Sequence, residues 1–388
     1  MRFKSVWTTE PNPVAAAEKL CAGVRGCDPD LAILFTSHHY DPEFERLLSD
    51  VHGGINARNL IGCAAESVIG PDREIERQPS AVLWVAELPR VRVLPFILDF
   101  MDLQTLGTAE SFRDRIGVAL DDRPSFIIIP DPFSMPADDL LGRLDRAFPG
   151  SPIVGGMASG AEAIGQTRLF LNDQVLRQGV VGVTLTGDVT ITSVVSQGCR
   201  PVGKTYVITG CRDNLITELG GRPAYEVLKE VYAGASAQEQ ELMQTGVHVG
   251  RVVNEALDEH SPGDILVRNV LGVVGGKAIA VGDYLRLGQA VQFHVRDARS
   301  ADKDMRLLIR SRVVERNLSP AGGLLFSCNG RGSRLFGQPN HDISIVNELI
   351  DSCEVAGFFA GGEIGPIGDA TFVHGLTSSL VLFTSPEP

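Results

Sequence analysis

The chain has 388 residues, of which 44% are hydrophobic, so it can bury more than one core without the help of disulfides or structural metals. Its formal net charge of −13 excludes nucleic acid or an anionic membrane surface as the main partner, because both attract clustered Lys and Arg. No apolar stretch approaches the ~20 residues that cross a bilayer, and the seven cysteines contain no C-x-x-C pair. We therefore expect a cytoplasmic protein whose cysteines are thiols, with no metal site and no cofactor.

The first strong signal is an apolar run at residues 31–35, which predicts a buried strand. After a polar loop, Asp41 as cap and Pro42 as the first helical residue predict the start of a helix. A second apolar run at residues 59–61 follows that helix and ends in the small residues of 62–66. This order of strand, polar loop, helix, strand and small-residue turn is typical of a strand–helix–strand unit.

The loop of this unit contains His38 and His39, which are candidate metal ligands by residue type. Adjacent residues of a strand point to opposite faces, so the two imidazoles would not converge there. The pair therefore gives little support to a metal site.

The same order recurs in the middle of the chain. The strand is expected at residues 126–129, and a helix leads from it to the turn at 155–160. A later apolar run at 180–185 reaches a turn at 186–188 and continues into the alternating run 189–195. This pattern predicts a β-hairpin, so we expect the sheets to be mixed rather than purely parallel.

A third occurrence lies near the carboxyl end. The apolar run 324–326 leads into a glycine-containing polar loop at 327–332, and Asp342 is expected to cap the helix that follows. The chain returns through residues 355–359 to a second glycine turn at 360–363. If the strands of such a unit are parallel neighbours, both loops lie at the carboxyl edge of the sheet, where α/β sheets bind ligands.

Three occurrences of one pattern indicate duplication of a supersecondary unit. We predict an α/β to α+β fold, with mixed β-sheets and helices built from repeated strand–helix–strand units in two domains. Pro223 at a helix start marks a change of domain, which gives domains at 28–221 and 222–388. In the second domain the run 291–297 alternates strictly, so that one of its faces carries Gln292, His294 and Arg296.

The chain resembles the FIST family, named for F-box and intracellular signal transduction proteins, with an amino-terminal and a carboxyl-terminal FIST domain. The stretches SCNGRG and AGFFAGGEIGP carry most of the resemblance, and the full set is Pro130, Asp131, residues 153–156, Arg268, and residues 291–298, 324–332 and 356–366. No F-box helix cluster is expected ahead of residue 28. The resemblance implies a stand-alone sensory fold that binds a small ligand, such as an amino acid or a derivative of one.

Three arginines are the best candidates for ligand contacts: Arg268, Arg296 and Arg331. A guanidinium binds a carboxylate or phosphate through two parallel hydrogen bonds. For Arg296 the alternative is a structural ion pair with the adjacent Asp297. The complete set of expected ligand-binding residues is Gly155, Gly156, Arg268, His294, Arg296, Cys328, Asn329, Arg331, Gly361, Gly362 and Glu363.

The glycine turns at 155–156 and 361–362 could present N–H groups to an anion, but glycines after strands also serve close packing. Glu363 would either orient an amino group of a ligand or cap its own turn. Cys328 follows a strand beside Arg331, whose charge would stabilise a thiolate. The alternative is that Cys328 is a small buried residue.

No catalytic signature surrounds Cys328, although His294, His341 and His374 could serve as its base. We therefore favour a sensor that is not an enzyme, over a thiol-dependent enzyme that uses Cys328 or a protein-interaction scaffold. The sensor predicts a pocket between the loops 327–332 and 360–363, lined by at least two of the three arginines. Its partners would be a small-molecule ligand and a signalling protein.

Overall fold

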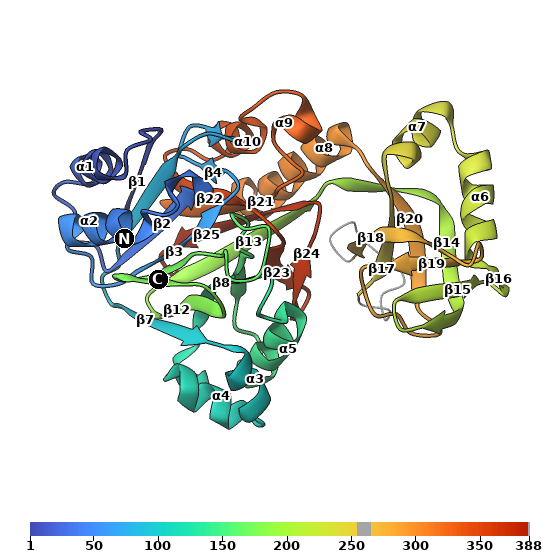
Figure 1. Ribbon diagram of the computed structural model, residues 1–388, viewed down its shortest axis with the longest axis horizontal. Coiled ribbons are helices and arrows are strands. Elements are labelled where there is room, and N and C mark those ends of the chain that lie inside the picture. The colour runs from blue at the N-terminus through green and yellow to red at the C-terminus, as the bar shows by residue number, and fades with distance from the viewer. Residues whose placement is uncertain (254–264, 387–388) are drawn as a thin grey trace. The chain divides into compact units, whose positions relative to one another are not determined.

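The computed structural model describes residues 1–253 and 265–386, which fold into two compact units. Unit 1 consists of residues 1–195, 306–373 and 377–388, and unit 2 consists of residues 196–305 and 374–376. Unit 2 is thus largely an insertion in the sequence of unit 1, and residue 222, where we expected the domain boundary, lies within it. Figure 1 labels the elements of both units.

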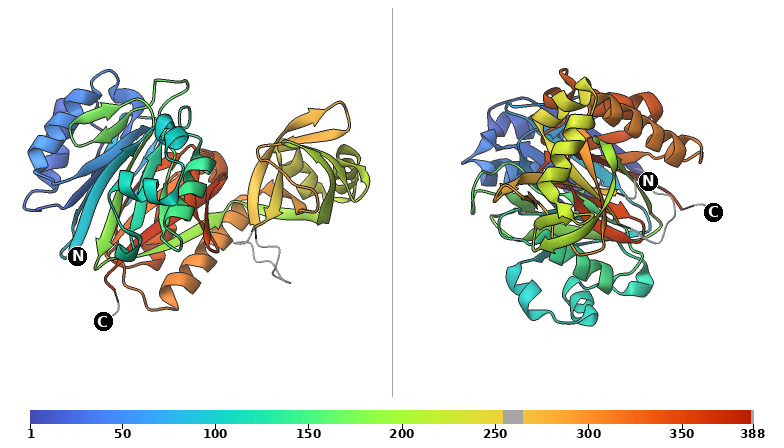
Figure 2. Two further views of the ribbon diagram at one scale, coloured as in Figure 1. Left: turned by 90° about the horizontal axis from the view of Figure 1, so that it is seen from below. Right: turned by 90° about the vertical axis from the view of Figure 1, so that its right-hand side faces the viewer.

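The first sheet of unit 1 contains the first predicted strand–helix–strand unit. Strands β2 (Leu31–Ser37) and β3 (Leu60–Ala65) are parallel neighbours, and α2 (Phe44–Ile55) connects them. The sheet has the order β1–β6–β2–β3–β10–β11, and its other strands are β1 (Arg2–Thr8), β6 (Ala81–Glu87), β10 (Leu169–Leu171) and β11 (Gln174–Leu176). Helices α1 (Pro13–Gly23) and α2 cover its outer face with a buried apolar cluster (Figure 2).

The second sheet contains the second unit. Strands β8 (Ser125–Pro130) and β9 (Ile153–Gly156) are parallel, and α5 (Ala137–Ala147) connects them. The order is β24–β23–β9–β8–β12–β7, and the other strands are β7 (Val91–Leu98), β12 (Val180–Gly187), β23 (Glu363–Ile367) and β24 (Ala370–His374). Its outer face packs against α5 together with α3 (Phe100–Thr105), α4 (Ala109–Ile116) and a short 3-10 turn at Leu120–Asp122.

The third sheet contains the third unit. Strands β21 (Gly322–Cys328) and β22 (Glu354–Ala360) are parallel, and α9 (Ser333–Phe336) and α10 (His341–Leu349) lie between them in the chain. The order is β13–β25–β21–β22–β4–β5, and the other strands are β4 (Val68–Ile69), β5 (Glu74–Ile75), β13 (Thr190–Gln197) and β25 (Thr377–Thr384). Helix α8 (Ala298–Ile309) and a π-helical turn at Arg310–Val314 precede β21.

The three sheets are assembled in the same way and exchange hairpins. In each sheet, two further strands flank the parallel pair on one side and a short hairpin flanks it on the other. The hairpin after the first pair, β4–β5, lies in the third sheet, while β10–β11 lies in the first and β23–β24 in the second. The predicted duplication and mixed sheets are confirmed, and no sheet of unit 1 is built from a single repeat.

A glycine at the same place in each repeat lets the parallel strands approach. The residues that face each other across the three pairs are Leu34 and Gly62, Ile128 and Gly155, and Leu325 and Gly357. A Cβ atom on each glycine would lie within 1.9 Å of the carbonyl oxygen opposite, a separation that no side chain can adopt. The repeats therefore share a steric requirement as well as an order of elements.

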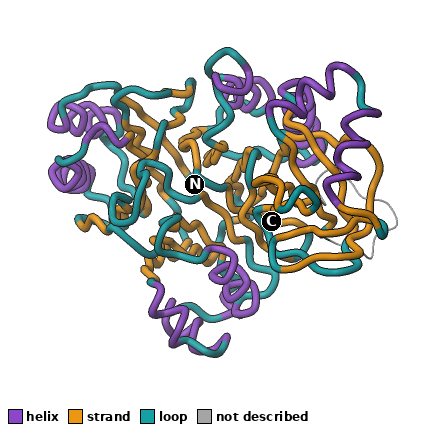
Figure 3. The backbone as a smooth tube through the Cα atoms, turned by 45° about the vertical axis from the view of Figure 1, so that its right-hand side comes forward, coloured by secondary structure: helices purple, strands orange, loops and turns teal. Residues whose placement is uncertain are grey.

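The main core of unit 1 lies between the inner faces of its sheets, and Figure 3 shows helices of this unit outside its strands. Each sheet contributes large apolar side chains to it, such as Phe35, Ile127 and Phe326. Phe35 and Phe326 make an edge-to-face contact with ring centroids 6.3 Å apart. These apolar runs are continuous because both faces of the strands are buried.

Unit 2 is a closed ring of strands with two helices. Its sheet has the order β14–β20–β17–β18–β19–β15–β16, and an additional pairing between β14 and β15 closes it. The strands are β14 (Cys199–Arg212), β15 (Leu215–Leu219), β16 (Arg222–Pro223), β17 (Val247–Val252), β18 (Ile265–Val274), β19 (Ala278–Val281) and β20 (Ala290–Arg296). Helices α6 (Ala224–Gly234) and α7 (Ala237–Thr245) pack on its apolar core.

The hairpin predicted at residues 180–195 does not form. Strand β12 pairs with β8 and β7 in the second sheet, whereas β13 pairs with β25 in the third. The turn is real, but β12 ends the second repeat and β13 begins the third. Because β12 already has a neighbour on each side, it has no edge left for β13.

The structure also corrects the two helix caps that were predicted at Asp41 and Asp342. Helix α2 begins at Phe44 with Glu43 at the cap position, so Asp41 and Pro42 precede it. Helix α10 has Asn340 at its cap position, and the Asp342 side chain is used elsewhere. His38 and His39 lie in a 3-10 turn rather than a strand, and their rings stack 4.2 Å apart.

Candidate ligand pocket

The small-residue turns of the three repeats meet at the carboxyl edge of the parallel strand pairs. Three backbone hydrogen bonds join them in pairs: Gly160 N donates to Ala64 O (3.2 Å), Met157 N to Gly362 O (2.8 Å) and Phe359 N to Ser67 O (3.0 Å). A Cβ atom on Gly160 would lie 2.8 Å from the carbonyl carbon of Ala64, so only glycine allows this approach. The turns are thus joined into one hydrogen-bonded surface, which we call the floor.

A cavity of about 860 Å³ opens beside this floor, within unit 1. Its walls are loops that follow β2, β3, β9 and β21, so all three repeats contribute to it. The lining residues are His38, His39, Asp41, Phe44, Ala64, Glu66, Arg77, Ser159, Gly160, Ala161, Glu162, Gln166, Arg168, Asn329 and Arg334. We expected a pocket between the loops 327–332 and 360–363. This cavity is lined by Asn329 of the first loop but by no residue of the second, and its arginines are not those expected from the sequence.

Arg168 forms part of one wall and is only 7% exposed. Its Nη1 donates to the carbonyl of Gln166 at 2.7 Å, and its Nη2 donates to Asp41 Oδ1 at 3.1 Å. The guanidinium carbon lies 5.9 Å from the centre of the Phe44 ring. These contacts hold the guanidinium in one place at the pocket wall.

Arg334 connects the opposite wall to the first repeat. Its Nη2 lies 2.6 Å from Glu66 Oε1, and its Nη1 donates to the carbonyl of Asn329 at 2.9 Å. The side chain remains 45% exposed. Asn329 Oδ1 is buried and accepts no hydrogen bond from the part of the chain that the structure describes.

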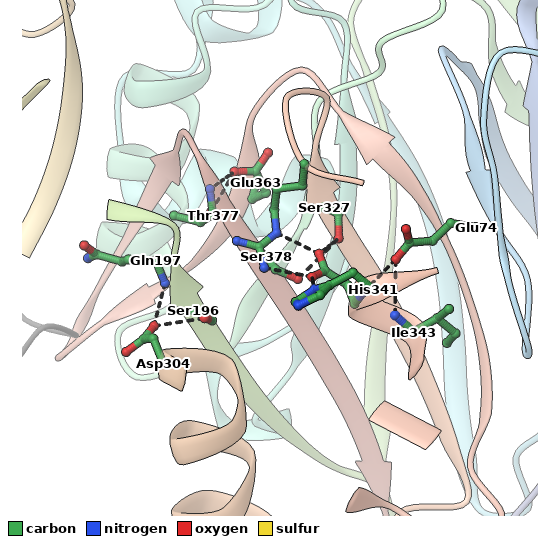
Figure 4. Close-up of polar contacts among 12 residues, drawn as sticks. Glu74, Ser196, Gln197, Asp304, Ser327, His341, Ile343, Glu363, Thr377 and Ser378 are labelled. Carbon is green, nitrogen blue, oxygen red and sulfur yellow. Dashed lines mark hydrogen bonds and ion pairs between the residues drawn. The ribbon is translucent and has the colours of Figure 1, made fainter. Parts of the chain in front are cut away.

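Arg331, one of the three arginines expected to contact a ligand, is fully buried and does not line the cavity. Its Nε and Nη2 donate to the two carboxylate oxygens of Asp342 at 2.7 and 2.8 Å. Ser327 Oγ donates to the same carboxylate at 2.8 Å, and His341 Nδ1 lies 2.9 Å from it (Figure 4). Burial opposes the charged form of Arg331, but the charge of Asp342 outweighs it and raises the pKa of the guanidinium.

Glu74 binds the backbone of the same buried network. Its Oε1 accepts hydrogen bonds from the backbone N–H groups of Asp342 (2.8 Å) and Ile343 (3.2 Å), so a residue of β5 caps α10. Burial and the nearby charge of Asp342 raise the pKa of Glu74 to about 8. Burial alone would also raise the pKa of Asp342, but Arg331 and His341 hold it below its ordinary value.

The other unit 1 candidates lie around the same loops. Cys328 is half-buried and close enough to Arg331 to contribute to the raised pKa of the guanidinium. Glu363 is fully buried and accepts hydrogen bonds from Thr377 N and Oγ1 at 3.1 and 2.6 Å. The N–H of Gly361 donates to the Met157 carbonyl at 3.0 Å.

The remaining glycine candidates pack closely. Gly155 is the close-approach glycine of the second repeat, and a Cβ atom on Gly156 would lie 3.1 Å from Ala360 Cβ. Gly362 accepts a backbone hydrogen bond from Met157. These glycines therefore build the floor beside the pocket.

Three sequence candidates belong to unit 2. Arg268 lies 3.7 Å from Asp283, which also accepts a hydrogen bond from Arg251 at 2.7 Å. His294 and Arg296 are on β20, as the alternation predicted. The expected set is therefore divided between the units, and of its unit 1 members only Asn329 lines the cavity.

Sequence reasoning missed, as site residues, the six Arg, Asp and Glu residues that line the cavity: Asp41, Glu66, Arg77, Glu162, Arg168 and Arg334. Two of them had a usable signal, because Glu66 ends a small-residue turn and Arg334 lies two residues after the glycine-containing loop at 327–332. Arg168 had none, since its partner Asp41 is 127 positions away in the chain. Within the described ranges, no three His, Cys, Asp or Glu side chains are grouped so that they could hold a metal ion.

Fold and pocket together define an α+β protein of three interlocked repeats with an inserted strand barrel and a polar cavity at the shared carboxyl edge. The chain belongs to the FIST family: the FIST N domain matches residues 30–222 and the FIST C domain matches residues 224–366. The resemblance seen in the sequence is confirmed. FIST domains are sensory domains of signal transduction.

Two relatives cover nearly the whole chain. An uncharacterized protein of Mycobacterium tuberculosis is 40% identical over 99% of this chain and 100% of its own length. An uncharacterized protein of Mycobacterium bovis is 39% identical over 95% of this chain and 94% of its own.

Among solved structures, a cyanuric acid hydrolase from A. caulinodans aligns over 100% of this chain and 99% of its own, with 9% identity and a TM-score of 0.37. That similarity is too low to support an argument about this chain. In the described part of the protein, no helix is long and apolar enough to cross a membrane.

Proposed function

We propose that this protein is an intracellular sensor that binds a small carboxylate-bearing molecule, such as an amino acid, in the unit 1 cavity and does not turn it over. The observation that carries the proposal is the cavity itself, because loops of all three repeats converge on it and supply three arginines. A signalling protein would receive the information that the cavity is occupied.

The accessible arginines favour an anionic ligand. Arg77 and Arg334 have side chains that are 57% and 45% exposed, so N–H groups of both can reach a molecule in the cavity. The contacts of Arg77 are with Glu76 at 3.6 Å and Ser333 at 2.9 Å, which place it beside the same α9 segment that carries Arg334. A ligand carboxylate can accept charge-assisted hydrogen bonds from this pair of guanidinium groups.

The buried acceptor supports a ligand that also carries a donor. Asn329 lines the cavity, and its Oδ1 atom is buried with no partner among the residues described, which is costly for an acceptor. An ammonium, amide or hydroxyl group of the ligand could satisfy it. Glu66, Asp41 and Glu162 add negative charge on the same walls, which suits a ligand with an amino group.

The buried ion pair has a positioning role in this proposal. Arg331 stands between Asn329 and Arg334 in the chain, and its bonds to Asp342 fix the loop that presents both. The sequence-derived candidates of unit 1 thus act mainly by shaping the cavity wall.

The proposal is tested by a thermal-shift screen of amino acids and small carboxylates, followed by isothermal titration of the best ligand. Ligand at ~100 times its Kd should stabilise the fold by about 2.7 kcal/mol. Arg334→Gln should weaken binding by roughly 2 kcal/mol, because a charge-assisted contact is lost. Arg46→Gln is the matched control, since Arg46 is an exposed arginine paired with Asp50 outside the cavity. Equal affinity of wild type and Arg334→Gln would remove this cavity as the ligand site.

A further inference from the structure

Arg296 in unit 2 presents an unusual buried edge. Its Nε and Nη2 atoms are buried and donate no hydrogen bond within the described ranges 1–253 and 265–386. These two N–H groups form the side of the guanidinium that binds a carboxylate or phosphate through two parallel bonds. Nearly all buried polar groups of folded proteins have hydrogen-bond partners, so we expect an acceptor to bind this pair of donors.

The neighbouring carboxylate does not supply that acceptor. Asp297 follows Arg296 directly, but its Oδ2 accepts hydrogen bonds from Arg200 Nε at 3.0 Å and Ser300 Oγ at 2.7 Å. Its Oδ1 accepts a hydrogen bond from the backbone N–H of Arg299 at 3.2 Å. The ion pair between Arg296 and Asp297 that the sequence left open as an alternative is therefore not made.

Two buried histidines lie beside Arg296. His294 is two residues away on the same face of β20, and His248 faces His294 across the β17–β20 pairing. They are 2% and 8% exposed. Burial is the main cause of the lowered pKa of His248, and the hydrogen bond to Asn269 opposes it. The charge of Arg296 lowers this pKa further, so the two side chains are near each other.

The hydrogen bonds of both imidazoles show which ring nitrogen can accept a further hydrogen bond. His294 Nδ1 lies 3.0 Å from the carbonyl oxygen of Gln292, and His248 Nδ1 lies 3.0 Å from Asn269 Oδ1. Since both partners are oxygen acceptors, Nδ1 carries the proton in each neutral ring and Nε2 is the acceptor. The surroundings of Arg296 thus combine an unfilled pair of donors with two imidazole acceptors.

The backbone is shaped around this group. A Cβ atom on Gly250 would lie 2.3 Å from Cε1 and 2.7 Å from Nδ1 of His294. Glycine at this position of β17 therefore leaves the room in which the His294 ring lies. The arrangement is built by three neighbouring strands, because Asn269 on β18 orients His248.

We propose that Arg296, with His248 and His294 beside it, forms a second binding site, in unit 2, for a small oxyanion. The anion is a carboxylate or a phosphate that bridges Nε and Nη2 of Arg296, and a hydroxyl group on it would donate to an imidazole Nε2. This site goes beyond the proposed function, because all residues of the cavity belong to unit 1. Through this site the sensor would respond to a second ligand.

The test uses the full chain with 15N-labelled histidine, at fixed pH and ionic strength so that the imidazoles do not titrate during the experiment. Acetate and inorganic phosphate are added separately, and the 15N shifts of His248 and His294 are followed after assignment with single His→Gln variants. We expect a saturable shift with at least one probe. Arg296→Gln should weaken the apparent affinity at least tenfold, and Arg296→Lys, which keeps the charge but loses the two-pronged edge, should weaken it as well.

Arg299→Gln is the control, because Arg299 is exposed and close in sequence but has no side-chain contact with this group. It should bind like wild type. A response to acetate alone assigns the site to carboxylates, and a response to phosphate alone assigns it to phosphates. No response to either probe, or a response that survives in Arg296→Gln, overturns the proposal; if Arg296→Gln does not fold, Arg296→Lys decides. Arg334→Gln should leave the histidine shifts unchanged, so the two sites can fail independently.

Discussion

Arg331 and Asp342 form a fully buried ion pair in unit 1. Both side chains are at most 1% exposed, and Nη1 of Arg331 has no hydrogen-bond partner in the described residues. Taking two charges out of water is repaid only when the geometry is good, and here two bonds of 2.7 and 2.8 Å provide it. Breaking the pair leaves an uncompensated buried charge.

We therefore expect Asp342→Asn to lower the free energy of unfolding by roughly 3–5 kcal/mol, measured by urea denaturation. Asp50→Asn is the matched control, because it makes the same chemical change in an exposed pair with Arg46. It should cost no more than about 0.5 kcal/mol. A loss below 1 kcal/mol for Asp342→Asn would show that the guanidinium finds water or another partner when Asp342 is neutralised.

Single residues also show the limit of prediction from sequence. The polar loop at 327–332 was recognised because glycines and an arginine follow a strand. Arg331 was expected to contact a ligand and Asp342 to cap a helix, but the two side chains bind each other. Which charged residues meet depends on the packing of distant segments, and no local pattern contains that information.

At the scale of elements, the capping of α10 by Glu74 links two repeats and should depend on pH. Burial and the charge of Asp342 raise the pKa of Glu74 from 4.5 to about 8, so the folded protein holds this proton more tightly than the unfolded chain. The corresponding stability is complete below pH 4.5 and is lost as the pH rises through about 8.

Glu74→Gln keeps a carbonyl oxygen for the two backbone N–H groups but removes the titration. Relative to this variant, wild type should lose stability between pH 5 and pH 9, by at most about 1.4 kcal/mol per pH unit. Urea denaturation of both proteins across this range measures the difference. Glu45→Gln, a change in the first turn of α2, should leave the pH dependence of wild type intact. Parallel pH profiles for wild type and Glu74→Gln would contradict the assignment.

A second prediction at the scale of elements concerns Gly62, Gly155 and Gly357, the glycines that let the parallel strands approach. In Gly357→Ala the new methyl group would lie 1.8 Å from the carbonyl oxygen of Leu325, which belongs to a fixed backbone. Strands β21 and β22 must then separate, and we expect a loss of about 1–3 kcal/mol or more. Gly53→Ala is the control, because its Cβ atom meets nothing within 4 Å inside helix α2, and alanine there should stabilise by about 0.5–1 kcal/mol. A neutral Gly357→Ala would show that the strand pair tolerates wider spacing.

Element order was the part of the fold most accessible to sequence. Short apolar runs that end in glycine or polar loops are strong strand signals, and all three parallel pairs were found from them. The pairing of β12 and β13 was predicted incorrectly because a turn between two strands does not reveal that they belong to different repeats. The exchange of hairpins between sheets could not be predicted for the same reason. Strands β4 and β5 are two residues long, and their hairpin joins a distant repeat through the pairing of β4 with β22.

At the scale of the whole molecule, the residue ranges of the two FIST domains differ from those of the two compact units. The FIST C match at residues 224–366 includes β17 to β20 but lacks β14 and β15, which close the strand ring of unit 2. The same range contains β21 and β22 but lacks β25, β4 and β5, their neighbours in the third sheet. A fragment cut at these limits has exposed strand edges on two sheets.

Residues 196–305, in contrast, include every strand of the unit 2 ring. The apolar core of that ring consists of side chains between Val202 and Val295, all within the fragment. We therefore expect a fragment of residues 196–305 to unfold cooperatively in urea and to give a dispersed amide spectrum, while a fragment of residues 224–366 aggregates or remains unfolded. Co-expression of 224–388 with 1–223 should rescue folding, because the two pieces together restore all four sheets. Cooperative folding of 224–366 alone would mean that the family's carboxyl-terminal domain is self-sufficient and that the exchanged hairpins contribute little to stability.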